Sequence, residues 1–268
     1  MLRPLFIFCL SICLTSVVHA EAFDHSVWNK LVTDHVKNVQ ENQLNQITAV
    51  DYDTLAIEIP LLKEYLKQTS EVTRIQFDSW SQNEQLAFLI NTYNAATVQL
   101  VLTGYPNIKS IRDLGSFFNS PFKKDFISLF GDNISLDDIE KGFVIGSDNY
   151  NDPRAHFALN CASISCPALR AEAYNGDRLE AQLNSQMTAF LSDRDRNKLD
   201  GKILKLSKIF DWYDDDFEAG WQNITSLEEF LVFNAAALGL TAEQFESLRN
   251  GKIKIRYFDY DWNLNKIK

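Results

Sequence analysis

Apolar residues occupy nearly every side of a helix drawn through residues 81–103, and this pattern predicts a helix that is buried all round. Ser81 stands three residues before Glu84, which is the capping-box spacing that begins many helices. Gly104-Tyr105-Pro106 then supplies both of the residue types that usually end one. We therefore expect this helix to form the buried centre of the fold.

Shorter patterns on either side predict further helices and a few strands. Helical spacing of apolar residues predicts helices between Phe23 and about Gln68, and then over residues 177–191, 208–219, 225–237 and 241–249. Turn residues predict a hairpin that turns at Gly131-Asp132-Asn133, with strands over residues 126–130 and just after Asn133. A short apolar run predicts a buried strand over residues 155–159, and further strands are predicted over residues 203–206 and 253–257. The fold class expected from these elements is α+β, mostly helical, with a central buried helix and a small, mainly antiparallel sheet.

The first twenty residues have the pattern of an export signal. Arg3 precedes an apolar run, and Val18-His19-Ala20 places small residues before a cleavage point. The run is too short to span a bilayer, so we expect no integral membrane segment after its removal. The chain is then organised as a signal peptide (1–20), an N-terminal helical segment packed on the core (21–75) and a main domain (76–268), in a periplasmic or secreted protein.

Composition narrows the range of partners. Nineteen Phe, nine Tyr and five Trp, with only six Pro and ten Gly, indicate a well-filled core without a disordered tract. The net charge of −10 argues against nucleic acid or anionic lipid as a partner. An exported polypeptide or a small ligand is the expected partner instead.

The densest chemistry lies in the loop from His156 to Pro167, which follows Asp152-Pro153-Arg154. It combines an imidazole, the thiols of Cys161 and Cys166, and the hydroxyls of Ser163 and Ser165. Cys9 and Cys13 would leave with the signal, so these two cysteines would be the ones present in an oxidising compartment, where disulfides form.

Three motifs, in this order along the chain, resemble the family called domain of unknown function 547 (DUF547). They are Leu86 to Ala95, Ser135 to Glu140, and Asp152-Pro153-Arg154 leading into the loop. The resemblance runs from about residue 78 to residue 190 and continues more weakly beyond. The family name states no activity, so the resemblance implies a domain and its extent but no reaction. Family members often have serine where this chain has Cys166, which implies that a disulfide here would be a local addition.

Three interpretations of the loop are open. Cys161 could be a nucleophile activated by Arg154 or His156, although an extended chain would point residues five apart to opposite faces. It could instead form a disulfide with Cys166 across a compact turn. His156, Cys161 and Cys166 could bind zinc with a fourth ligand, but their spacing is wider than in zinc fingers, and we predict no metal and no cofactor.

Polar residues outside the loop extend the candidate site. Asn91 and Asn94 share one face of the buried helix and need partners, either in a polar cleft or in a neighbouring loop such as that of Cys161. Glu140 is the expected ion-pair partner of Arg154. The acidic run 214–216 is interpreted as a solvated turn.

Two functions follow. The first is a binding or interaction module in which a disulfide holds the loop over residues 156–167. The residues expected to bind the ligand are Asn94, Glu140, Arg154, Ser163 and Ser165. The alternative is a cysteine-dependent hydrolase or acyltransferase of papain- or transglutaminase-like chemistry, with Cys161 as nucleophile, His156 as base and Asn91 orienting it. A disulfide would favour the first and a free, fast-alkylating Cys161 the second.

Overall fold

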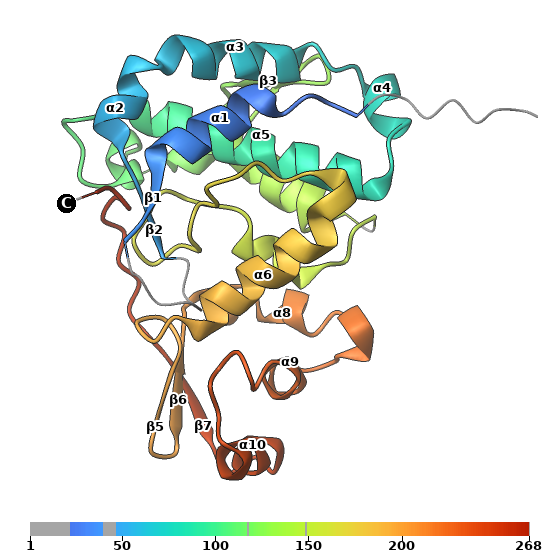
Figure 1. Ribbon diagram of the computed structural model, residues 1–268, viewed down its shortest axis with the longest axis vertical. Coiled ribbons are helices and arrows are strands. Elements are labelled where there is room, and N and C mark those ends of the chain that lie inside the picture. The colour runs from blue at the N-terminus through green and yellow to red at the C-terminus, as the bar shows by residue number, and fades with distance from the viewer. Residues whose placement is uncertain (1–21, 40–46, 117, 148, 268) are drawn as a thin grey trace, which may run out of the picture.

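The computed structural model describes residues 22–39, 47–116, 118–147 and 149–267 (Figure 1). The expected signal peptide lies outside these residues, as do Cys9 and Cys13. The fold is mostly helical, with two two-stranded sheets and one three-stranded sheet in the described part of the chain, and the predicted fold class is confirmed. Within the same ranges, no helix has both the length and the apolar character needed to cross a bilayer.

Helix α5 (Gln82–Leu102) is the centre of the larger of two hydrophobic cores, as predicted. Ser81 caps it: the Ser81 hydroxyl accepts the N–H of Glu84, and the Glu84 carboxylate accepts the N–H of Ser81. Every residue from 86 to 98 is buried, including two asparagines. A helix with no solvent-facing side can carry polar side chains only where other elements supply their partners.

The N-terminal elements pack on the same core. They are α1 (Ser26–His35), β1 (Val36–Asn38), β2 (Thr48–Val50), α2 (Tyr52–Ile57), α3 (Ile59–Ser70) and α4 (Arg74–Asp78). Helices α1 and α3 contact each other, and α3 contacts α5; Figure 1 shows them in blue to cyan over one side of the green helix. The antiparallel pair β1–β2, with Val36 opposite Val50, is an element that the sequence pattern did not predict.

The middle of the chain is built from short elements. They are the 3-10 helices η1 (Ile111–Leu114), η2 (Pro121–Lys123), η4 (Pro153–Phe157) and η5 (Gly176–Arg178), the strands β3 (Ile127–Leu129) and β4 (Asp132–Ile134), and the π-helix η3 (Asp138–Val144). The predicted hairpin is confirmed as the β3–β4 pair, but its turn is shorter than predicted, because β4 already begins at Asp132. The strand predicted over residues 155–159 is wrong, because Asp152 caps the N–H of Arg154 and Pro153 begins a helical turn there.

The C-terminal half surrounds a second, Phe-rich core. Its elements are α6 (Leu179–Ser192), β5 (Lys198–Asp200), β6 (Ile203–Leu206), α7 (Ile209–Trp212), α8 (Asp214–Phe217), η6 (Trp221–Asn223), α9 (Leu227–Phe233), α10 (Ala242–Arg249) and β7 (Lys254–Tyr257). Strand β6 pairs antiparallel with β5 and parallel with β7. Phe157 of η4 belongs to this second core, so η4 ties the two halves together.

The segment after β7 returns across the molecule to the first core. The N–H of Ile267 donates to the carbonyl of Val50, and the N–H of Leu264 donates to that of Lys109. In Figure 1 the dark red trace leaves the lower sheet and rises along the side that carries β1 and β2. This segment also lies against the Cys161 loop, so it contributes side chains to the candidate site.

Candidate functional site

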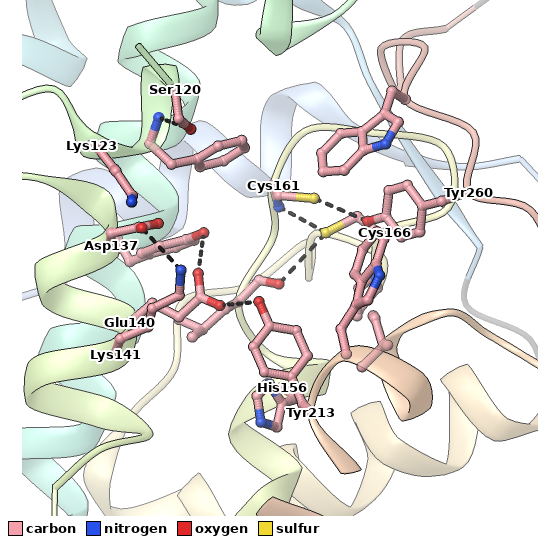
Figure 2. Close-up of a pocket in the computed structure, with 17 residues that line it drawn as sticks. Ser120, Lys123, Asp137, Glu140, Lys141, His156, Cys161, Cys166, Tyr213 and Tyr260 are labelled. Atoms are coloured by element: carbon pink, nitrogen blue, oxygen red, sulfur yellow. Dashed lines mark hydrogen bonds and ion pairs between the residues drawn. The ribbon is translucent and has the colours of Figure 1, made fainter. Parts of the chain in front are cut away.

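A cavity of about 340 Å³ opens beside the loop that holds Cys161 (Figure 2). We call it the Cys161 pocket. Its walls come from α5, η2, η3, η4, α7 and the segment after β7, and it is lined by Tyr93, Ser120, Phe122, Lys123, Asp137, Glu140, Lys141, His156, Leu159, Cys161, Cys166, Pro167, Ile209, Trp212, Tyr213, Tyr260 and Trp262. Aromatic walls with a few converging polar groups are typical of a ligand site.

Asn94 fixes the backbone that enters the loop. Its amide donates to the carbonyl of Ala158 (3.0 Å) and accepts the N–H of Asn160 (2.8 Å). Asn160 in turn donates to the carbonyl of Pro167 (2.7 Å) and accepts the N–H of Ala162 (3.0 Å). Ala162 has a φ of 60°, a left-handed conformation that costs a non-glycine residue free energy. These bonds hold the residue after Cys161 in that conformation.

Asn91 lies on the same helix but serves another segment. Its amide donates to the carbonyl of Tyr174 (2.8 Å) and accepts the N–H of the same residue (2.9 Å). Both of these amide atoms therefore bind one backbone position, and Asn91 does not line the Cys161 pocket. The structure does not bring Asn91 to Cys161 or to His156.

Both cysteines are free, so the disulfide between Cys161 and Cys166 is not formed. The compact turn that it required is present, with the N–H of Cys166 donating to the carbonyl of Ser163. The sulfur of Cys166, however, accepts the N–H of Cys161 (2.8 Å) and lies 3.8 Å from the carbonyl oxygen of Leu159. Backbone groups of the loop thus engage the sulfur that the disulfide would have used.

The half-buried Cys161 sulfur has polar neighbours of its own. It lies 3.3 Å from the hydroxyl of Ser163 and 3.2 Å from that of Tyr260. Burial raises the pKa of the thiol, but hydrogen bonds with Cys166, Ser163 and Tyr260 outweigh burial, and the pKa falls below its usual value. Burial and the neighbouring sulfur raise the pKa of Cys166 well above its usual value. Cys161 is therefore the more acidic thiol of the pair.

His156 lines the same pocket but is not bonded to Cys161. Its Nε2 lies 2.9 Å from the Asp216 carboxylate, and its ring centroid lies 4.3 Å from that of Tyr213. A carboxylate only accepts, so Nε2 carries the proton and Nδ1 is left to exchange one. Asp216 belongs to the acidic run 214–216, and the interpretation of that run as a solvated turn is wrong for this residue. No local pattern links positions 60 residues apart.

Glu140 and Arg154 do not form the ion pair that we expected. Glu140 accepts hydrogen bonds from the hydroxyls of Tyr93 (3.0 Å) and Tyr213 (2.7 Å), the second of which is drawn in Figure 2. The guanidinium of Arg154 is buried and is paired with Asp152 and Glu180. The prediction is wrong because closer carboxylates satisfy Arg154, which leaves Glu140 facing the pocket.

Residues 77–191 match the sequence model of the family described as "Protein of unknown function, DUF547". This part of the chain is a DUF547 domain. No curated protein and no solved structure matched the chain. The DUF547 domain contains the Cys161 loop and Glu140, whereas other walls of the Cys161 pocket, including Tyr213 and Trp262, come from residues after the domain.

The segment after β7 completes the site beside the DUF547 domain. Ser165 fastens it, because the Ser165 hydroxyl accepts the N–H of Asp261 (2.9 Å) and the Ser165 N–H donates to the Asp261 carbonyl (3.1 Å). Ser163 donates to the hydroxyl of Tyr260 (3.1 Å). The sequence pattern singled out both serines but missed Tyr260, which stands almost a hundred residues further along the chain.

The zinc interpretation is not supported by these positions. His156 is directed to Asp216, while the two sulfurs bind groups of the loop and Tyr260. Among the residues that the structure describes, no three His, Cys, Asp or Glu side chains are grouped so that they could hold a metal ion.

Proposed function

We propose that the DUF547 domain and the residues that follow it form a cysteine-dependent hydrolase or acyltransferase, with Cys161 as nucleophile. The observation that carries the proposal is the free, half-buried Cys161 thiol on the wall of the pocket, with a pKa lowered by three hydrogen-bonding neighbours. A reactive cysteine needs a stabilised thiolate and access to a substrate, and this position offers both.

His156 is the proposed base, oriented by Asp216 rather than by Asn91. The Cys161 sulfur would attack an acyl carbon and form a C–S bond, while Nδ1 of His156 takes the thiol proton through the substrate or a bridging water. As the tetrahedral intermediate collapses, the C–N or C–O bond breaks and the same proton passes to the leaving amine or alcohol. Water, or a second amine or alcohol, then attacks the thioester and restores the thiol.

The second candidate is a binding module without covalent chemistry. The observation that favours it is the bond between His156 and Asp216, which leaves Cys161 without a directly bonded imidazole. The aromatic wall of Trp212, Tyr260 and Trp262 would then hold an apolar or planar ligand.

Alkylation by iodoacetamide, followed by mass spectrometry, separates the two candidates. Under the enzyme proposal, Cys161 alkylates about tenfold faster at pH 7 than an unperturbed thiol, and Cys166 reacts more slowly. Cys161→Ser is expected to lose the fast reaction, which assigns that reaction to the Cys161 thiol. The enzyme proposal is contradicted if Cys161 reacts no faster than a simple peptide thiol and forms no acyl adduct with an activated ester. The binding module is then the function that the site supports.

Export remains a proposal as well. The composition of residues 1–20 supports it, with Arg3 before the apolar run and Ala20 before the expected cleavage. Expression in a diderm host, fractionation and N-terminal sequencing test it. A mature chain that begins at Glu21 in the periplasm is the expected result, and an uncleaved cytoplasmic chain contradicts it.

A further inference from the structure

A second cavity, of about 490 Å³, adjoins the Cys161 pocket. We call it the Arg112 pocket; it lies beside Arg112, Ser116 and Pro121. It shares Ser120, Phe122, Lys123 and Trp262 with the Cys161 pocket. The two hollows therefore share one wall, and a ligand long enough to cross that wall can contact both.

The charges of the Arg112 pocket have one sign. Its charged lining residues, Arg112 and Lys123, are both basic. Lys141 in the Cys161 pocket is paired with Asp137 at 2.9 Å, whereas neither Arg112 nor Lys123 has an ion-pair partner among the residues that the structure describes. In a chain of net charge −10, two unpaired cations in one hollow create a local preference for an anion.

The aromatic ring between the two pockets positions one of these cations. The guanidinium carbon of Arg112 lies 5.0 Å from the ring centroid of Trp262, within the range of a cation–π contact. Trp262 also lies 6.4 Å from the ring of Phe122, centroid to centroid. The planar guanidinium is thus held at the edge of the hollow, where its remaining N–H groups can bind a carboxylate.

We infer that the substrate is an extended acyl compound with a carboxylate several bonds from the carbonyl that is attacked. This inference rests on the proposed function of Cys161. The carboxylate lies against Arg112 and Lys123, the chain passes Trp262, and the acyl carbon reaches the sulfur. The C-terminal end of a peptide and a short dicarboxylic acyl group both have this chemistry.

Matched electrophiles test the inference in the full chain. Chloroacetyl-glycylglycine and chloroacetyl-aminocaproate have a carboxylate at a similar distance from the reactive carbon, and their C-terminal methylamides are the neutral counterparts. In each, the Cys161 sulfur forms a C–S bond while the C–Cl bond breaks and chloride leaves. We expect the carboxylate probes to modify Cys161 about tenfold faster than the neutral ones, as for two exposed ion pairs.

Variants assign the preference to the two cations. The double variant Arg112→Gln/Lys123→Gln is expected to bring the ratio of the carboxylate-probe rate to the neutral-probe rate to about one. Lys124→Gln is the matched control, because Lys124 is exposed and lines neither pocket, and it is expected to keep the ratio. A faster glycylglycine probe would identify a peptide substrate, and a faster aminocaproate probe an aliphatic acyl group.

The outcomes separate this inference from the proposed function. The inference is overturned if every probe modifies Cys161 rapidly with no preference for the carboxylate. It is also overturned if the double variant retains that preference. In both cases the proposed role of Cys161 as nucleophile still stands. A Cys161 that reacts with all probes no faster than a simple peptide thiol overturns the proposed function itself.

Discussion

Asn94 and Asn91 make equivalent pairs of hydrogen bonds from α5 to two different loops, and only the first loop holds Cys161. Replacing Asn94 with Ala leaves the carbonyl of Ala158 and the N–H of Asn160 without their partner in a buried site. Each lost bond is expected to cost about 1–2 kcal/mol, so the free energy of unfolding falls by about 2–4 kcal/mol. For a chain of this size that lowers Tm by about 5–15 °C.

The same substitution is expected to change the reactivity of Cys161. Once Ala162 is released from its left-handed conformation, the thiol loses its fixed hydrogen-bonding neighbours, and its pKa returns toward the usual value. At pH 6.5 the rate of alkylation by iodoacetamide then falls, because a higher pKa lowers the fraction of the thiol that is present as thiolate. Asn91→Ala is the control, with a similar loss of stability and an unchanged alkylation rate.

The assay combines urea unfolding, followed by circular dichroism, with alkylation measured well below the unfolding transition. Equal alkylation rates in Asn94→Ala and the wild type would refute the link between the loop conformation and the thiol. A similar fall in both variants would instead attribute the effect to general loosening of the core.

Three further substitutions test other parts of the structure. Tyr260→Phe removes a hydrogen-bonding neighbour of Cys161, so the midpoint of its alkylation rate against pH moves upward; an unmoved midpoint contradicts the assignment. Burial lowers the pKa of His25 from 6.5 to about 4, so as pH falls the unfolded chain binds this proton before the folded one does. Stability is therefore lost on acidification, by about 2 kcal/mol between pH 7 and pH 5, and His25→Gln should lack this share in urea unfolding. Phe157→Ala should lower the free energy of unfolding by about 3–5 kcal/mol, and a loss below 1 kcal/mol in the same assay would show that η4 does not tie the two cores together.

The parts of the fold that depend on neighbouring residues were predictable from the sequence. Helix α5 begins and ends where its capping box and its Gly-Tyr-Pro sequence place it, because those signals act within a few residues. The β3–β4 hairpin follows from local turn chemistry in the same way. The strand expected over residues 155–159 is absent because a short apolar run does not distinguish a strand from a helix by its periodicity. The preceding Asp152-Pro153 begins a 3-10 helix there instead.

The candidate site was predictable only in part. The motif placed His156, Cys161 and Cys166 in one loop, but the partner of each is set by packing between distant segments. Asp216 and Tyr260 enter the site from elements 60 and 99 residues away, and no spacing rule connects such positions. Glu140 was expected to pair with Arg154, but it accepts hydrogen bonds from two tyrosines, and Arg154 pairs with Asp152 and Glu180 instead.

The crossing of the segment from Tyr260 to Asn265 over the Cys161 loop sets the order in which the site can assemble. A growing chain that has reached Pro167 already contains both thiols and their loop. It still lacks the Tyr260 hydroxyl and the backbone bonds that join Ile164 to Asn263 and Asn265 to Ala162. Until this segment docks, the thiol therefore lacks one of the three hydrogen-bonding neighbours that lower its pKa. Under the proposed function, the nucleophile thus gains its full set of hydrogen-bonding neighbours only after nearly all of the surrounding structure has formed.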